Sequence, residues 1–288
     1  MSEARCDVCF RHCLIHEGGR GFCGARTASG GKVYPENYGR ITSLALDPIE
    51  KKPLRRFYPG SRILSAGSCG CNLRCPFCQN YEISWSEKAM GFKARAEYLP
   101  PEELAAIAVR LRSEGNIGVA FTYNEPLIGY EYIIDTARLI RREGMKTVLV
   151  TNGTAELHVL EKTGPYIDAM NIDLKGFSEH YYSDILDGRL EMVKDFITRA
   201  VQLTHVELTT LIVPGENDSE EEMSDMSRWI YERKDAGGRR MGEEIPLHVS
   251  RFFPCFHMTD RKATPVRTVY RLAEKARENL RYVYTGNC

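Results

Sequence analysis

From residue 62 to its end, the chain alternates between short apolar runs and longer amphipathic segments. The apolar runs cover residues 62–68, 117–123, 146–151, 167–173, 206–214 and 245–252. Segments with a helical spacing of apolar residues cover 100–114, 127–143, 155–163, 178–203, 218–234 and 264–280. Strands that alternate with helices indicate parallel βα units. Six such units predict an open or partial α/β barrel, although a doubly wound sheet would produce a similar pattern.

The first 60 residues have a different character from the rest. They are rich in Cys, Gly and Arg, show no long helical periodicity, and close with the turn-like sequence FYPGS at 57–61. Such a segment has little hydrophobic core of its own, so a bound metal would help to hold it together. We therefore expect a small, loop-rich, cysteine-rich N-terminal module at 1–60 and an α/β core at 61–288.

Composition and charge limit the classes of function. The chain has 288 residues, and Lys plus Arg and Asp plus Glu both number 39, so its formal net charge is zero. Balanced charge argues against a dedicated nucleic-acid or membrane-surface protein. No stretch approaches ~18 consecutive apolar residues, and the start MSEARCDVCF resembles neither a signal peptide nor an anchor. We expect a cytoplasmic protein.

Ten cysteines are distributed unevenly along the chain. Among reduced thiols, clustered cysteines more often bind metals or do chemistry than form disulfides. Cys71, Cys75 and Cys78 form C-x3-C-x2-C directly after a predicted strand. A complete protein set for an iron–sulfur cubane is four thiolates, so three would leave one iron open to a small molecule. The alternative is a zinc site completed by Cys69 or a distant histidine, but the spacing and the aromatic Phe77 favour iron–sulfur.

This cysteine pattern, with an aromatic residue before its last cysteine, resembles the signature of the radical S-adenosylmethionine (SAM) enzymes. The resemblance implies a partial (βα)6 barrel and a [4Fe–4S] cluster whose open iron binds SAM. It also implies that an electron from the reduced cluster cleaves SAM to a 5′-deoxyadenosyl radical, which takes a hydrogen atom from a substrate. A reductant such as flavodoxin or ferredoxin is then an expected partner.

Further motifs narrow the resemblance. The sequences DPIEKKPLRRFYPGS (47–61), GCNLRCPFCQN (70–80), FTYNEP (121–126) and HVSRFFP (248–254), with the cysteine-rich segment 5–26, are similar to the AmmeMemoRadiSam-system radical SAM family. That family is related to the pyruvate formate-lyase activating enzymes. The resemblance of the chain to this family leaves the substrate unidentified. Two alternatives stay open, an activating enzyme that acts on a glycine of a partner protein and a metal-binding scaffold without catalysis.

The resemblance also implies SAM-binding residues at the ends of predicted strands. Asn124 and Glu125 stand where activating enzymes carry a Gly-Gly-Glu-like segment that contacts the methionyl ammonium, and their alternative role is to begin the next helix. Asn152 belongs to a Thr-Asn-Gly segment that resembles the family's, but it could simply make a turn. Asp173 and Lys175 resemble an Asp-Leu-Lys segment and would bind ribose hydroxyls and the SAM carboxylate. Their alternative is a mutual ion pair.

The N-terminal cysteines form a second candidate metal site. Cys6, Cys9, Cys13 and Cys23 are a complete set of four thiolates for zinc or for a second iron–sulfur cluster. We lean slightly to iron–sulfur, because relatives of activating enzymes often carry auxiliary clusters.

Four further residues have two interpretations each. His248 and Arg251 have nearly opposite phase on the last long strand, so one of them could face the cavity, although a hydrogen-bonded core histidine is the commoner outcome. Tyr81 and Trp85 follow the cysteine triplet and could shield the cluster from water, or simply pack.

Overall fold

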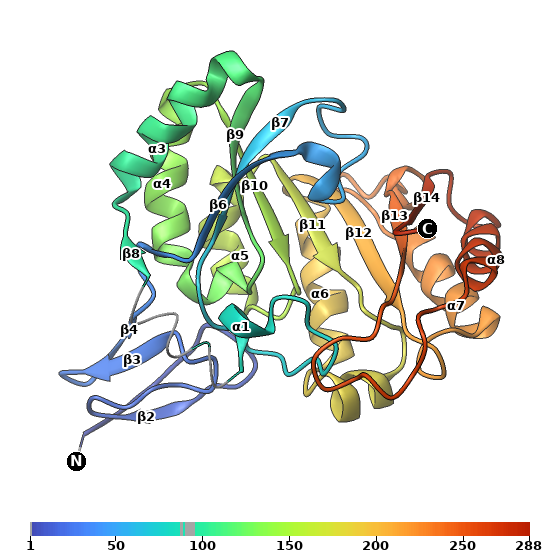
Figure 1. Cartoon of the computed structure of the whole chain (residues 1–288), viewed down its shortest axis with the longest axis horizontal. Coiled ribbons are helices and arrows are strands. Elements are labelled where there is room, and N and C mark those ends of the chain that lie inside the picture. The colour runs from blue at the N-terminus through green and yellow to red at the C-terminus, as the bar shows by residue number, and fades with distance from the viewer. Residues whose placement is uncertain (1, 87–88, 90–95) are drawn as a thin grey trace.

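The structure, a computed structural model, describes residues 2–86, 89 and 96–288. At its centre is an eight-stranded sheet with the strand order β14-β13-β12-β11-β10-β9-β7-β6 (Figure 1). In this sheet the seven strands β7, β9, β10, β11, β12, β13 and β14 are parallel, and β6 is antiparallel to β7. The parallel strands follow one another in chain order, without the reversal that defines a doubly wound sheet. The partial-barrel prediction is therefore confirmed.

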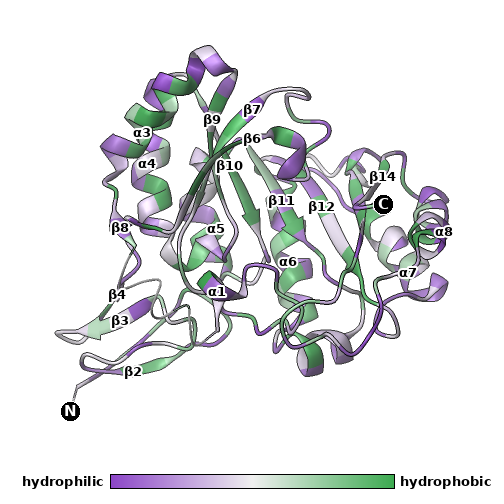
Figure 2. Cartoon of the chain, viewed as in Figure 1, coloured by the Kyte–Doolittle hydropathy of each residue, from purple (hydrophilic) through white to green (hydrophobic). Residues whose placement is uncertain are grey.

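Helices connect the successive parallel strands. The strands are β7 (Arg62–Gly67), β9 (Asn116–Thr122), β10 (Lys146–Thr151), β11 (Ala169–Asp173), β12 (His205–Ile212), β13 (Leu247–Arg251) and β14 (Val283–Gly286). The connecting helices are α3 (Pro101–Arg110), α4 (Tyr130–Arg142), α5 (Leu157–Thr163), α6 (Leu190–Ala200), α7 (Glu220–Tyr231) and α8 (Val266–Arg277). Figure 2 shows hydrophobic residues concentrated on the central strands, whereas the helices alternate between hydrophobic and hydrophilic positions. Among the described residues, no helix is long and apolar enough to cross a membrane.

One predicted helix, at 178–203, is only partly correct. The structure has a π-helical turn at Tyr181–Ile185, and α6 begins at Leu190. Between them, Asp187 adopts a φ of 52°, a left-handed conformation that Asp tolerates better than most residues. The backbone N–H of Gly188 then donates to the carbonyl of Tyr182 at 2.7 Å, which turns the chain before α6.

The inner face of the sheet is closed at the amino ends of its strands by the segment that follows β6 (Ser43–Pro48). Apolar side chains of this segment pack against apolar residues of four strands: Ile49, Leu54 and Phe57 against Ile63, Ala120, Val148 and Ala169. Glu207 on β12 holds the segment, because its carboxylate accepts hydrogen bonds from the backbone N–H groups of Arg55 at 2.9 Å and Arg56 at 2.7 Å. Residues 47–61 thus form the floor of the barrel.

The N-terminal residues form short antiparallel pairs beside the barrel (Figure 1). β1 (Glu3–Arg5) pairs with β2 (Leu14–His16), and β3 (Arg26–Ser29) pairs with β4 (Lys32–Pro35). β5 (Arg40–Ile41) pairs with β8 (Glu97–Tyr98). The division into 1–60 and 61–288 stays a prediction, but β6, which precedes residue 60, pairs along its length with β7 in the main sheet.

Candidate active site

A cavity of about 290 Å³ lies at the carboxyl ends of the parallel strands. Its walls come from the loop after β7, from the ends of β9, β10, β11, β12 and β13, and from Asn287 near the C-terminus. All eight residues proposed for the first cluster and for SAM line it: Cys71, Cys75, Cys78, Asn124, Glu125, Asn152, Asp173 and Lys175. Residues far apart in sequence meet here because parallel strands end at the same edge of a sheet.

The loop after β7 brings three thiols to this cavity. The amide of Asn152 donates to Sγ of Cys71 at 3.8 Å, and the hydroxyl of Ser84 faces the thiol of Cys78. Burial raises the pKa of all three thiols, that of Cys75 to about 12. Buried thiols of this kind ionise when a bound cation compensates their charge. Three such thiols at one cavity, with donors to their sulfurs, fit an iron–sulfur cluster with an open iron.

Glu125 is 2% exposed, and its carboxylate accepts three hydrogen bonds. Oε1 accepts from the backbone N–H of Leu127 at 3.0 Å and from the hydroxyl of Thr151 at 2.8 Å. Oε2 accepts from the backbone N–H of Asn152 at 2.7 Å. Burial raises the pKa of Glu125 to about 7. The side chain therefore does begin the next helical turn, and it also ties the end of β9 to the end of β10.

Asn124 connects the end of β9 to the beginning of the cysteine loop. Its Oδ1 accepts from the backbone N–H of Ser68 at 3.1 Å, and its Nδ2 donates to the carbonyl of Gly70 at 3.0 Å. The preceding Tyr123 has a φ of 74°, which is a strained conformation for a bulky residue. The Tyr123 hydroxyl donates to Asp47 at 2.8 Å, so the floor of the barrel helps to hold this conformation.

Asp173 and Lys175, at the end of β11, form the ion pair that the sequence left as an alternative. Lys175 Nζ lies 2.7 Å from Oδ2 of Asp173, and both side chains line the cavity. Burial opposes the charge on Lys175, but Asp173, together with Cys75 and Tyr182, more than offsets this and raises the pKa of Lys175. The same ammonium group partly opposes the burial that raises the pKa of Cys75, so the cation of Lys175 lies near the cysteine loop.

A loop after β13 packs against the cysteine loop and carries Cys255, to which no spacing in the sequence assigns a role. The Cys255 thiol donates to the carbonyl of Cys78 at 3.7 Å. Phe256 stacks on Tyr81 with ring centroids 4.3 Å apart and meets Trp85 edge-on at 4.8 Å. Because 177 residues separate Cys255 from Cys78, no local spacing could have revealed the contact.

Neither of the two candidates on β13, the last long strand, faces the cavity. His248 is buried, and its Nε2 lies 2.7 Å from Oε2 of Glu207, so it is a hydrogen-bonded core histidine. Arg251 donates through Nε to the carbonyl of Thr264 at 2.7 Å. Among the described residues that line the cavity, this strand contributes Ser250, and neither His248 nor Arg251.

Within the described ranges, no three His, Cys, Asp or Glu side chains lie close enough to hold one metal ion. This applies to the cysteine triplet of the cavity as well as to Cys6, Cys9, Cys13 and Cys23. A cluster does not require such convergence, because each thiolate bonds to a different iron atom.

Comparisons with known proteins agree with this geometry. The sequence model of the Radical SAM superfamily matches residues 67–227. The chain is 39% identical to the uncharacterized protein MJ0808 of Methanocaldococcus jannaschii, over 99% of this chain and 82% of that protein. It is 29% identical to the pyruvate formate-lyase-activating enzyme of Clostridium pasteurianum, over 62% of this chain and 72% of that enzyme.

Solved structures show the same fold. A radical SAM methyltransferase from Sphaerobacter thermophilus superposes with a TM-score of 0.57 and 15% identity, over 80% of this chain and 67% of that one. The superfamily match covers more than half of the chain and includes all three cysteines of the cavity. The chain therefore belongs to the radical SAM superfamily of iron–sulfur enzymes, which use a [4Fe–4S] cluster, SAM and a reductant.

Proposed function

We propose that this chain cleaves SAM reductively and abstracts a hydrogen atom from a substrate that is still unidentified. The observation that carries the proposal is the shared cavity, which Cys71, Cys75 and Cys78 line together with the candidate SAM-binding residues of three other strand ends. The bound cluster and SAM would supply the 5′-deoxyadenosyl radical, and the protein would supply position and protection from water. Flavodoxin or ferredoxin would provide the electron.

The residues around the cavity have distinct proposed roles in binding SAM. Asp173 offers carboxylate oxygens to ribose hydroxyls, and Lys175 offers a cation to the SAM carboxylate. Their ion pair at 2.7 Å holds both side chains at the cavity wall. Asn124 and Glu125 present backbone carbonyls and a negative charge to the methionyl ammonium. Asn152 lies on the side of the cavity where the cluster would bind, and it contributes there through its hydrogen bond to Cys71.

The aromatic cover over the cysteine loop has a protective role in this proposal. Tyr81, Trp85 and Phe256 pack on one another beside Cys78. A radical generated there would react with small solutes if they entered freely. Exclusion of water and solutes from the site prevents such side reactions.

Single replacements of the cavity cysteines test the proposal. Cys71→Ala, Cys75→Ala and Cys78→Ala should each abolish the SAM-responsive cluster signal in electron paramagnetic resonance and stop 5′-deoxyadenosine formation with dithionite. Cys288→Ala is the matched control, because that cysteine is exposed and outside the cavity. A triple variant that still cleaves SAM at the wild-type rate would show that the assignment is wrong.

A glycyl-radical-enzyme activating enzyme is the second candidate, and the match to a pyruvate formate-lyase-activating enzyme favours it. Membership of the AmmeMemoRadiSam-system family, which we propose from residues 47–61, 121–126 and 248–254, favours a different, unidentified substrate. Incubation of the reduced enzyme with SAM and a glycyl radical enzyme separates them. A new glycyl radical signal supports the activating enzyme, whereas 5′-deoxyadenosine formed with consumption of a small molecule supports the first proposal. A scaffold protein would cleave no SAM.

A further inference from the structure

The four N-terminal cysteines gather at one place beside the barrel. Cys6, Cys9 and Cys13 lie at the ends and in the middle of the loop between β1 and β2, and Cys23 precedes β3. The backbone N–H of Cys6 donates to the carbonyl of Cys13 at 2.8 Å, which closes the loop. The backbone N–H of Phe22, the residue before Cys23, donates to Sγ of Cys13 at 3.4 Å, so the segment that carries Cys23 lies against this loop.

Backbone N–H groups lie close to each of these four sulfur atoms. The N–H of Phe22 donates to Sγ of Cys13, and the N–H groups of Val8, Arg11 and Ala25 face the sulfurs of Cys6, Cys9 and Cys23, in that order. A neutral thiol is a weak acceptor, whereas a thiolate is stabilised by N–H donors. In the cavity, the N–H group two positions later likewise faces the sulfur of Cys71 and of Cys78. The N-terminal loop is thus built for thiolates, as the cysteine loop of the cavity is.

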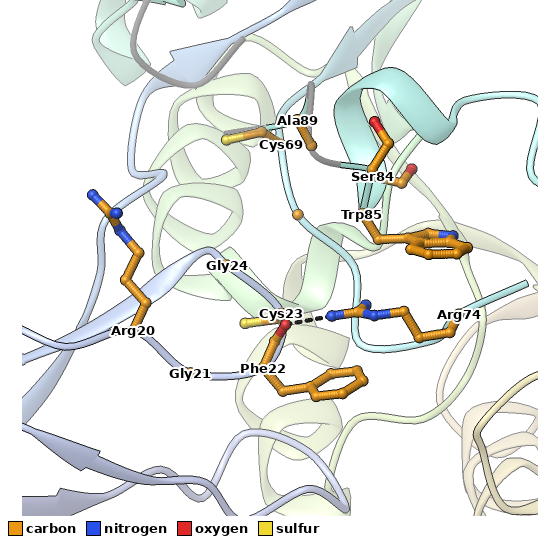
Figure 3. A pocket seen from close by; sticks show the side chains of 12 residues that line it. Arg20, Gly21, Phe22, Cys23, Gly24, Cys69, Arg74, Ser84, Trp85 and Ala89 are labelled. Atoms are coloured by element: carbon orange, nitrogen blue, oxygen red, sulfur yellow. Dashed lines mark hydrogen bonds between the residues drawn. The ribbon is translucent and has the colours of Figure 1, made fainter. Parts of the chain in front are cut away.

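This set of cysteines packs directly on the loop 71–78. Arg74 in that loop donates through its guanidinium to the carbonyl of Phe22 at 2.6 Å, next to Cys23 (Figure 3). Gly70, just before the loop, has a φ of 97°, and a Cβ at that position would lie 2.7 Å from the carbonyl oxygen of Cys23. The two groups of cysteines therefore occupy adjoining backbone segments.

Asn72 lies between the two groups of cysteines. Its amide donates to the hydroxyl of Thr154 at 2.8 Å and faces the thiol of Cys9, whose backbone pairs with Ala155 beside Thr154. Its Oδ1 accepts from Nδ2 of Asn152 at 2.9 Å, and the same Nδ2 reaches Sγ of Cys71 at 3.8 Å. Two amides thus lie between a sulfur of one group and a sulfur of the other.

We propose that Cys6, Cys9, Cys13 and Cys23 bind a second metal centre through four thiolates, and that Asn72 couples this centre to the cluster of the cavity. An iron–sulfur cluster and a zinc ion share this ligand chemistry, and the separation of the thiols favours the cluster, whose irons each take one thiolate. Hydrogen bonds to ligand sulfurs help to set the reduction potential of a cluster. A metal bound to Cys9 changes the electrostatic field at the Asn72 amide. Asn72 in turn orients the amide of Asn152 that reaches Cys71. The coupling rests on the proposed function, because it requires a cluster in the cavity, whereas the second centre does not.

Metal analysis tests the second centre without the first. The full-length Cys71→Ala/Cys75→Ala/Cys78→Ala protein, purified without oxygen, should hold about four irons with sulfide, or about one zinc, per chain. Adding Cys6→Ser and Cys23→Ser should remove this metal. If the triple variant does not fold, the metal content of Cys6→Ser/Cys23→Ser is compared with that of wild type, and the same amount of metal should be lost. If the metal content does not fall in that comparison, or if a folded triple variant holds no metal, the second centre is wrong. Either result leaves the proposed function in SAM cleavage standing.

A double-mutant cycle tests the coupling. The midpoint potential of the cavity cluster is measured in wild type, Cys9→Ser, Asn72→Leu and the double variant. Cys9→Ser should shift the potential, and the shift should shrink when Asn72 is absent. Equal shifts in the two backgrounds, or no shift at all, would overturn the coupling. Asn116→Leu is the control for loss of a buried amide, because Asn116 makes its hydrogen bonds at the amino end of β9 and should leave the potential unchanged.

Discussion

Replacing Glu125 with Gln tests whether the link between β9 and β10 supports the binding of SAM. The carboxylate uses both oxygens to accept from three donors, on Leu127, Thr151 and Asn152. Glutamine has a single acceptor oxygen and an NH₂ group, so at least one donor must face an N–H and lose its partner. Leaving one buried group unsatisfied costs roughly 1–3 kcal/mol. That cost corresponds to about a 5- to 150-fold change in an equilibrium constant.

The donor on Asn152 has the shortest of these hydrogen bonds, at 2.7 Å, and the side chain of the same residue reaches Cys71. We therefore expect Glu125→Gln to lower both the free energy of unfolding and the affinity for SAM, with the iron content unchanged. Urea unfolding and anaerobic titration calorimetry measure the two effects. Glu161→Gln is the control, because its ion pair with Arg199 is at the surface and contributes less than about 1 kcal/mol. Wild-type stability and affinity in Glu125→Gln would refute the reasoning.

Three further changes test other parts of the structure. Burial opposes the charge of Glu207, but hydrogen bonds from two histidines and two backbone N–H groups lower its pKa from 4.5 to about 2. The ionised Glu207 carboxylate contributes roughly 3 kcal/mol to the free energy of unfolding above pH 4.5, and this contribution is lost as the pH falls towards 2. The free energy of urea unfolding should therefore depend less on pH in this range in Glu207→Gln than in wild type. Lys175→Met should weaken SAM binding by about 10- to 150-fold in calorimetry, because it removes a charge-assisted hydrogen bond of about 1.5–3 kcal/mol. Gly70→Ala should lower the melting temperature, because its Cβ would clash with the carbonyl of Cys23 at 2.7 Å.

Each of these expectations has a clear contrary result. An acid transition as steep in Glu207→Gln as in wild type would mean that this carboxylate does not stabilise the floor of the barrel. Unchanged SAM affinity in Lys175→Met would leave the lysine with its ion pair alone. A Gly70→Ala protein as stable as wild type would mean that the N-terminal segment can shift away from the cysteine loop without cost.

Local patterns in the sequence were sufficient for most of the fold. Strand and helix periodicities depend on neighbouring residues, so the alternation of the two identified six βα units and their order. The strand ends could also be located, which placed Asn124, Asn152 and Asp173 at a common edge of the sheet. The cysteine spacing at 71–78 is local as well, because one short loop supplies all three thiols.

Local patterns could not decide how separate segments pair. A doubly wound sheet and a partial barrel have similar element strings, and only the hydrogen-bonded order of the strands distinguishes them. Likewise, residues 47–61 carry a recognisable motif, but their role as the floor of the barrel depends on Glu207, about 150 positions away. Strand phase left His248 and Arg251 as candidates for the cavity, whereas packing against Glu207 keeps His248 below it.

The sequence by itself therefore determined the kind of chemistry, since three closely spaced thiols at a strand end define a loop that can hold a cluster. Tertiary structure decided what surrounds those thiols. Cys255 reaches Cys78, and Asn72 reaches Cys9, only because the chain folds distant segments against the same loop. Such contacts depend on side-chain direction and on the closure of long loops, and neither is encoded in the spacing of residues along one segment.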